Sequence, residues 1–426
     1  MRLEIPYADR FVEADIPAAN LCFDLSPADA PPVADPDAEI RRAVAQPIGA
    51  LPLHDLARSR RRVVIIADDN TRVTPTRRIV PVLLDELNRA GVPDACISVI
   101  VASGTHRPMT PQEIDEKYGE PVLSRVPVLN HNYHDADNLV DYGATRRGTR
   151  IVVNRQVVEA DMRLGVGNIV PHHPTGWSGG AKIVLPGVGG EETVAQMHLL
   201  GSTDPHLGVV ETAMRQEMED FAEVIGLDFI VNTVLNRDGE LVAAVAGHFV
   251  AAHRAGVARA RAVYGVPFSE PADLTLSSTS PVDFDFFQAD KGIFAAELAT
   301  RPGGEIVLLS ACHEGFSPAH ADLAEYGGLD DETIWARVKT GRIHDPLTAA
   351  EALAINHIKR RFQVAVVSEG FTPAMAEAMG FRHVAPDELG VYLRGRLAES
   401  PGLRIGLLRQ SAEILPVLPE AVLVAA

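Results

Sequence analysis

A glycine-rich segment contains the residues best suited to covalent chemistry. The segment HHPTGWSGGAKIVLPG, residues 172–187, combines two histidines and four glycines with a single lysine, Lys182. In a phosphate-binding loop, Ser or Thr follows such a lysine and helps to hold magnesium. Here Ile183 follows, so that explanation fails. Because lysines can also bond covalently to cofactors, Lys182 is a candidate nucleophile.

Three histidines lie where they could transfer protons or bind a metal. His106, in SGTHR, is expected at the end of a strand, and His172 opens the glycine-rich segment. Imidazole exchanges protons near neutral pH, although capping of nearby backbone groups is the alternative at both positions. His198 lies sixteen residues after Lys182. One histidine does not make a protein metal site, so a metal there would take its other ligands from a bound organic group.

Two further segments could bind an anion. ADDNTR, residues 67–72, contains Asp69 and Arg72, and an arginine can bind a carboxylate or phosphate through two hydrogen bonds. DFDFFQADK places Gln288 and Lys291 three residues apart on one helical face. A turn with a solvated charge and an ordinary exposed lysine are the alternatives at these two places.

Alternating strands and helices must position these residues. Runs rich in Val and Ile predict strands at 61–70, 96–106 and 150–170. Apolar residues at helical spacing predict helices at 77–92 and 191–200. In open parallel sheets, ligands bind at the carboxyl ends of the strands. Asp69 and His106 are expected at those ends.

The second half of the chain predicts another α/β domain. Asp238-Gly239 indicates a hairpin within 229–247, and an Ala- and Arg-rich helix follows as far as Gly265. Further strands are expected in 274–280, 305–316 and 362–371. Because 426 residues exceed one compact core, we expect two domains with mostly parallel sheets and an active site in the cleft between them.

The Pro- and Ser-rich segment VPFSEPAD marks the domain boundary. We expect an N-terminal α/β domain over 1–268, which carries Lys182 and the histidines. A C-terminal α/β domain over 269–402 then contributes Gln288 and Lys291. The tail, 403–426, is a candidate to return to the first domain.

The composition excludes several classes of protein. Hydrophobic residues make up 46% and charged residues 23%, which is typical of a globular chain. A net charge of -18 argues against a nucleic-acid binder, which needs a basic face. Three widely spaced cysteines provide no disulfide framework and favour the cytoplasm. No run approaches the ~20 apolar residues that span a membrane.

The ordered set of segments resembles the lactate racemase family, the nickel-pincer 2-hydroxy acid racemases. DNTR, SGTHR, SGGAKIVLPG and FFQADK occur in the order of that family, with His172 ten residues before Lys182 and His198 sixteen after it. The resemblance covers most of the chain. It implies inversion at C2 of a 2-hydroxy acid by reversible hydride transfer to a lysine-tethered nickel pincer nucleotide.

The resemblance also implies a role for each matching residue. Lys182 would carry pyridinium-3-thioamide-5-thiocarboxylic acid mononucleotide with Ni(II), and His198 would bind the nickel. The other residues of the cofactor site would be Asp69, Thr175, Ser178, Gly179 and Gly180, with Asp69 also orienting a neighbour. His106 and His172 would be the acid–base pair. Those that hold the substrate carboxylate would be Arg72, Gln288 and Lys291. The implied partners are a small 2-hydroxy acid and proteins that make and load the cofactor, while a homo-oligomer stays open.

Two departures from the family pattern bear on the substrate. Phe287 stands where lactate-specific members have a tyrosine, and no tryptophan occurs in 345–360, where the family has one. A wider pocket is the simplest inference, so lactate, malate and a sugar acid remain candidates. A non-catalytic nucleotide- or anion-binding protein of the same fold is the alternative, and a hydrolase or lyase using the same histidines is a third.

Overall fold

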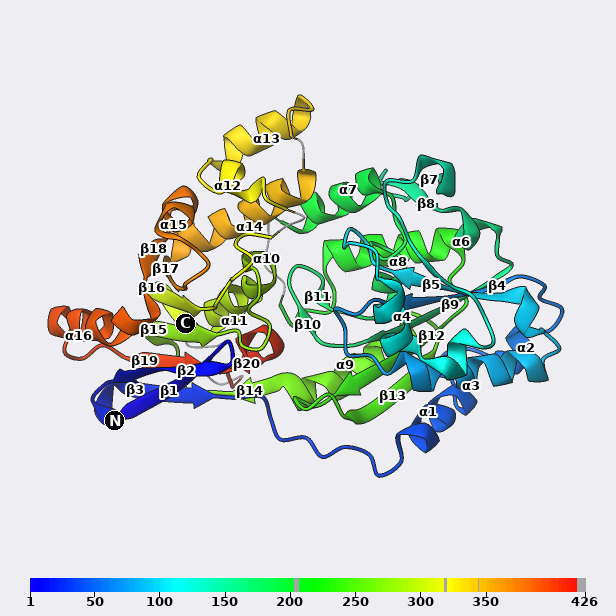
Figure 1. Cartoon of the computed structure of the whole chain (residues 1–426), viewed down its shortest axis with the longest axis horizontal. Coiled ribbons are helices and arrows are strands. Elements are labelled where there is room, and N and C mark those ends of the chain that lie inside the picture. Colours follow the sequence, from blue (N-terminus) through cyan, green and yellow to red (C-terminus); the bar gives the residue numbers. More distant parts are fainter. Residues whose placement is uncertain (203–206, 318–319, 344, 420–426) are drawn as a thin grey trace. The chain divides into compact units, whose positions relative to one another are not determined.

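The computed structural model describes residues 1–202, 207–317, 320–343 and 345–419. The chain divides into two compact units. The central unit comprises 29–201 and 208–263, and the terminal unit comprises 1–28 and 264–419 with Ser202 and Leu207. Each unit is built on one six-stranded sheet (Figure 1). The expected α/β class is therefore confirmed.

The central unit has the strand order β13-β12-β9-β4-β5-β6. Its strands are β4 (Val63–Asp68), β5 (Ile97–Ala102), β6 (Val128–Asn130), β9 (Met162–Asn168), β12 (Phe229–Leu235) and β13 (Leu241–Gly247). Neighbouring strands are parallel except for β12 and β13, which form the expected hairpin. Every residue of β4 is buried, as its continuous apolar run predicts for a central parallel strand.

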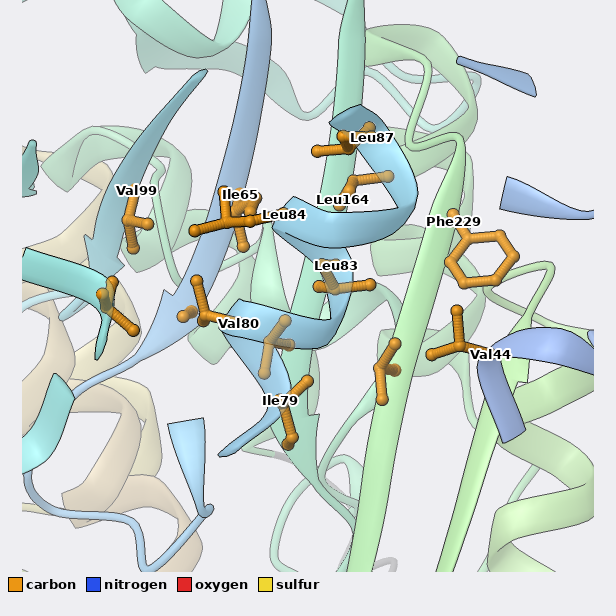
Figure 2. Close-up of a cluster of buried hydrophobic side chains, with 14 of the residues drawn as sticks. Val44, Ile65, Ile79, Val80, Leu83, Leu84, Leu87, Val99, Leu164 and Phe229 are labelled. Carbon is orange, nitrogen blue, oxygen red and sulfur yellow. The ribbon is translucent and has the colours of Figure 1, made fainter. Parts of the chain in front are cut away.

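Helix α3 (Thr76–Arg89) covers one face of this sheet because its apolar residues recur at helical spacing. Five of its apolar side chains are fully buried: Ile79, Val80, Leu83, Leu84 and Leu87. Figure 2 shows them beside Ile65 of β4, Leu164 of β9 and Phe229 of β12. Burial of each such side chain contributes about 1.5–3 kcal/mol. This packing fixes the strands whose ends carry the site.

The terminal unit has the strand order β18-β17-β16-β15-β19-β3, and all neighbours are parallel. Its strands are β3 (Leu21–Leu25), β15 (Ala272–Ser278), β16 (Thr300–Leu309), β17 (Gln363–Val367), β18 (Arg382–Val384) and β19 (Ile405–Leu408). A hairpin of β1 (Arg2–Tyr7) and β2 (Arg10–Asp15) packs into the same core. Three short two-stranded sheets pair β7 (Leu139–Ala144) with β8 (Arg150–Asn154), β10 (Pro171–His172) with β11 (Gly176–Trp177), and β14 (Gly265–Pro267) with β20 (Leu415–Val417).

The remaining α-helices are divided between the two units. In the central unit they are α1 (Pro36–Ala45), α2 (Leu53–Leu56), α4 (Pro111–Tyr118), α5 (Glu120–Leu123), α6 (Arg155–Glu159), α7 (Glu191–Gly201), α8 (Ala213–Ile225) and α9 (Ala251–Tyr264). In the terminal unit they are α10 (Phe286–Ala289), α11 (Lys291–Ala299), α12 (Leu323–Tyr326), α13 (Asp331–Lys339), α14 (Pro346–Arg361), α15 (Pro373–Met379) and α16 (Leu389–Glu399). Within the described ranges, none of the helices has the length and apolar character needed to cross a bilayer.

The units differ from the expected division into 1–268 and 269–402 at both ends of the chain. Strand β3 lies in the terminal sheet, so residues 1–28 do not belong with the central unit. Strand β19 pairs with β15, so the described part of the tail does not return to the central unit, and 420–426 lies outside the described residues. Local hydrophobicity predicts a buried strand but does not specify the sheet that it joins.

The strand expected over 150–170 is interrupted. Helix α6 separates β8 from β9, and the Asn154 side chain caps it by accepting a hydrogen bond from the Gln156 backbone. Asparagine is a favoured residue at this position because its side-chain oxygen satisfies an otherwise unpaired N–H.

Candidate active site

The catalytic candidates of the central unit follow three adjacent parallel strands. Asp69 follows β4, His106 lies in the loop after β5, and His172 lies in the loop after β9. Since parallel strands end at the same edge of a sheet, these loops meet there. The Gly104 N–H donates to the Gly187 carbonyl at 3.0 Å, which ties the His106 loop to the glycine-rich segment. The structure thus confirms that Asp69 and His106 lie at strand ends.

His106 is oriented by a carboxylate. Its Nδ1 lies 2.7 Å from Oδ2 of Asp69, whose side chain is 4% exposed. The other oxygen, Oδ1, accepts hydrogen bonds from the Thr71 backbone N–H and hydroxyl. Burial acts to raise the pKa of Asp69, but the hydrogen bond and charge of His106, with Arg72 and Thr71, hold that pKa well below its usual range. An ionised Asp69 therefore accepts the Nδ1 proton and leaves Nε2 as the basic nitrogen.

His172 is oriented by a hydroxyl instead. Strands β10 and β11 pair His172 with Gly176, and Thr175 lies in the turn between them. The Thr175 hydroxyl lies 3.0 Å from Nδ1 of His172 and donates its single proton to the Trp177 carbonyl at 2.9 Å. Because that proton is used, the hydroxyl accepts from Nδ1–H of His172. Both histidines therefore present Nε2 as the basic nitrogen.

Two glycines set the path of the chain next to Lys182. Gly179 and Gly180 have φ angles of 76° and 61°, in the region that favours glycine. A Cβ on Gly179 would lie 2.7 Å from Ile169, and one on Gly180 would lie 2.9 Å from His253. Between residues 176 and 185, Lys182 is the one partly exposed side chain. The tight turn thus presents the lysine from a buried segment.

Three buried residues that the sequence did not reveal hold this turn. Arg215 of α8 donates to the Gly179 carbonyl at 3.0 Å and also to the Trp177 carbonyl. Asn232 of β12 accepts from the Gly180 N–H at 2.8 Å. Burial lowers the pKa of Arg215 to about 10, so it remains charged at neutral pH. Its position on the buried face of α8, among methionines and Phe221, is the signal that a charged residue there has a partner.

The third of these residues is His253 of α9. Its Nε2 donates to the Ser178 carbonyl at 2.9 Å, and its Nδ1 accepts from Arg254. Burial, followed by the charge of Arg215, lowers the pKa of His253 well below its usual value. His253 is thus a neutral structural histidine with the opposite tautomer to His106 and His172.

The expected substrate-binding residues occupy both units. Arg72, in the central unit, is partly exposed and contacts the Thr71 carbonyl at 3.2 Å. Gln288 and Lys291, in the terminal unit, lie on α10 and at the start of α11, and the lysine Nζ donates to Gln288 Oε1 at 2.5 Å. The expected pairing of these two on one helical face is confirmed. An ammonium and an amide side by side can bind a carboxylate.

Comparison with known proteins identifies the family. The lactate racemase N-terminal domain model matches residues 7–208. A lactate racemase from Lactiplantibacillus plantarum is 33% identical over 334 residues, which cover 75% of this chain and 78% of the relative. One from Thermoanaerobacterium thermosaccharolyticum is 32% identical over 282 residues, covering 65% of this chain and 66% of the relative. The chain belongs to the lactate racemase family.

The fold agrees with this membership. The lactate racemase apoprotein structure from Thermoanaerobacterium thermosaccharolyticum superimposes with a TM-score of 0.87 at 26% identity, covering 99% of this chain and 100% of that one. A Thermotoga maritima protein, at 20% identity and a TM-score of 0.69, covers 90% of this chain and 98% of that one and shares the fold.

The residues present fit the cofactor expected for a lactate racemase family member in two respects. His198, on α7, donates Nδ1–H to the Val194 carbonyl at 2.8 Å, so Nε2 is the nitrogen that can ligate a metal. Metal-binding histidines are commonly oriented in this way. Lys182 is partly exposed directly after the glycine turn. In the described chain, no group of three His, Cys, Asp or Glu side chains could hold a metal, so nickel at His198 would need ligands from the cofactor.

The hydroxyls assigned to the cofactor site bond within the protein. Ser178 Oγ donates to the Asn168 carbonyl and accepts from the Val170 N–H, both at 2.8 Å. Thr175 is fully buried and bonds to His172 and Trp177. Their contacts to a cofactor, like those of Gly179 and Gly180, stay a prediction.

Proposed function

We propose that this lactate racemase family member is a racemase or epimerase that inverts C2 of a 2-hydroxy acid. In this proposal His106 and His172 are the acid–base pair, and Lys182 carries the nickel pincer nucleotide. His198 ligates the nickel through Nε2. The observation that carries the proposal is that these two histidines follow β5 and β9, the strands on either side of β4, and that each has Nδ1 bonded to a buried oxygen.

The chemistry of the bond explains why two histidines are needed. The C2–H of a 2-hydroxy acid is too weakly acidic for an imidazole to remove as a proton, and the bound cofactor supplies a hydride acceptor. Nε2 of one histidine accepts the hydroxyl proton as the alcohol is oxidised, and Nε2 of the other donates a proton when the opposite enantiomer forms. Each imidazole thus acts as base in one direction and acid in the other.

The substrate carboxylate is assigned to Arg72, Gln288 and Lys291. A guanidinium can bind a carboxylate through two parallel hydrogen bonds, which fixes orientation as well as position. The Lys291 ammonium, already directed by the Gln288 amide oxygen, adds a second positive charge. These contacts would overcome the net charge of -18 locally and hold C2 in place.

Chiral chromatography tests the proposal directly. Protein co-expressed with the cofactor-making and loading proteins is supplied with nickel and incubated with single enantiomers of lactate, malate and an aldonate. We expect one of these acids to racemise, and mass spectrometry to detect an adduct on the Lys182 peptide. Lys182→Ala should lose both adduct and activity, whereas Lys339→Ala, at an exposed position of α13, should keep both.

Binding of a 2-hydroxy acid without interconversion by adduct-bearing protein would instead support the non-catalytic alternative. Cleavage of the carbon skeleton would support a hydrolase or lyase.

A further inference from the structure

The central unit contains a lysine to which the proposed function assigns no role. Lys117 lies in the last turn of α4, and its side chain is 9% exposed. Its Nζ lies 3.3 Å from Oδ1 of Asp68 and donates to the Arg72 carbonyl. Asp68 is the last residue of β4, and Arg72 closes the turn that follows this strand. One ammonium therefore joins the end of the strand to the end of the turn.

The position of Lys117 in its helix does not require these contacts. A cation in the last turn of a helix interacts favourably with the carbonyls there, and a lysine normally keeps its ammonium in water. Lys117 instead directs its ammonium to a carbonyl 45 residues earlier in the chain. Because removal of an ammonium from water costs free energy unless other partners replace the water, this placement indicates a specific role at the turn.

The turn between Asp69 and Arg72 is closed weakly from within. The Arg72 N–H donates to the Asp69 carbonyl at 3.3 Å, which is longer than the usual distance of about 2.9–3.0 Å. Lys117 adds a charge-assisted hydrogen bond to the Arg72 carbonyl from outside the turn. This bond fixes the peptide group next to the Cα that bears the Arg72 side chain.

Helix α4 is held in place without the Lys117 side chain. A capping box begins the helix. The Thr76 hydroxyl donates to the Lys117 carbonyl at 2.9 Å, a backbone contact that every variant at this position keeps. Tyr118 is fully buried, and its hydroxyl donates to the Asp68 carbonyl at 3.2 Å. Replacement of the Lys117 side chain should therefore leave the helix intact and act on the turn.

We propose that Lys117 is a positioning residue, which holds the turn in the conformation in which Arg72 binds the substrate carboxylate. This inference rests on the proposed function, because Arg72 is taken to bind that carboxylate. Asp69 lies in the same turn, but the Thr71 N–H and hydroxyl hold its carboxylate beside His106. Loss of the Lys117 contacts should therefore weaken substrate binding more than proton transfer.

Steady-state kinetics of the loaded enzyme separate these two effects. Lys117→Met removes the ammonium and keeps an unbranched side chain of similar length. We expect KM to rise roughly 10-fold, the lower end of the range for one lost hydrogen bond to a charged group, and kcat to change by less than about 3-fold. In an Arg72→Ala background, Lys117→Met should change KM by less than about 3-fold, because the residue through which it acts is gone. Glu116→Met, at an exposed position of α4, is the matched control and should keep both constants.

Amide hydrogen exchange provides a readout that does not depend on turnover. Mass spectrometry follows peptides that cover residues 69–72 in full-length wild type, Lys117→Met and Glu116→Met. We expect the Thr71 and Arg72 amides to exchange at least about 5-fold faster in Lys117→Met alone, because the turn opens more often. Faster exchange in a protein whose wild type racemises no 2-hydroxy acid would count against the proposed function and still support the placement of the turn by Lys117.

Three results would overturn the inference. The first is unchanged exchange in Lys117→Met, and the second is an equal rise of KM with and without Arg72. The third is a lower melting temperature with an unaltered KM, because Lys117 would then contribute to stability alone.

Discussion

The two histidines proposed as the acid–base pair, His106 and His172, have similar hydrogen-bond geometry, but their partners differ in charge. Both donate Nδ1–H to a buried oxygen, so both present Nε2. The oxygen facing His106 belongs to the ionised carboxylate of Asp69, whereas the oxygen facing His172 belongs to the neutral hydroxyl of Thr175. A carboxylate stabilises an imidazolium through its charge, and a hydroxyl only through its dipole.

This difference shows how a symmetrical reaction can use an asymmetrical site. The equilibrium constant between two enantiomers is one, so kcat/KM must be the same in both directions. Orientation of Nε2 is therefore required of both histidines, but equal charge is not.

Replacement of Asp69 by asparagine should lower kcat more than any other change predicted here. Asp69 accepts from three donors, namely the Thr71 N–H, the Thr71 hydroxyl and Nδ1–H of His106. An amide has one acceptor oxygen, which the Thr71 N–H and hydroxyl would retain, so its NH2 group would face His106 and favour the wrong tautomer. We expect kcat to fall by about 10³- to 10⁴-fold, as for the equivalent change in a Ser-His-Asp triad.

Steady-state racemisation in both directions measures this effect, with circular dichroism and nickel content as controls for folding and loading. Equal kcat values for Asp69→Asn and wild type would show that the carboxylate does not orient the base.

Removal of the Thr175 hydroxyl should have a smaller effect. Thr175→Val keeps the shape of the side chain but leaves Nδ1–H of His172 without this acceptor, while Nε2, the proposed base, is retained. We expect kcat to fall about 10- to 100-fold, consistent with the loss of one neutral buried hydrogen bond, and KM to change little. Thr175→Ser restores the acceptor and should recover kcat to within a few-fold of wild type.

A hydroxyl that serves only to pack the β10–β11 turn would give another pattern. In that case Thr175→Val would lower the melting temperature without a selective loss of kcat, and Thr175→Ser would not rescue activity.

The sequence predicted well the local helices and strands, and the edge of the sheet at which the candidate site residues lie. The apolar runs and helical spacing placed β4, α3 and β5, and the alternation of strands and helices placed Asp69 and His106 at strand ends. These features depend on local burial and backbone preference, which a sequence pattern reports directly.

Contacts between distant segments could not be predicted in this way. Nothing in the pattern pairs Arg215 with the Gly179 carbonyl 36 residues away, or His320 with Asp345 25 residues away. Such pairs form through tertiary packing, and the position of a single polar residue in an amphipathic helix does not identify its partner. The same limit explains why β3 was not assigned to the terminal sheet.

Replacement of His253 should have the smallest effect, and that effect is on stability, because burial keeps this histidine neutral. Its pKa is below the usual value in the folded protein, so as pH falls below about 6.5 the unfolded chain takes up the proton first. Above that pH, the contribution of His253 to the free energy of unfolding is fully present. Below it, the free energy of unfolding decreases, by at most about 1.4 kcal/mol per pH unit from this group. His253→Gln can still donate to the Ser178 carbonyl but does not titrate.

Urea unfolding between pH 5 and pH 7.5 isolates this contribution as the difference between wild type and His253→Gln. We expect a shallower loss of stability on acidification in the variant, and His134→Gln, at an exposed position, is the control for replacing a surface histidine. Carboxylates that titrate in the same range affect all three proteins alike and cancel in the difference. Identical slopes for wild type and His253→Gln would mean that His253 accepts a proton in the folded state as readily as in the unfolded chain, and its tautomer would then not be fixed by the glycine turn.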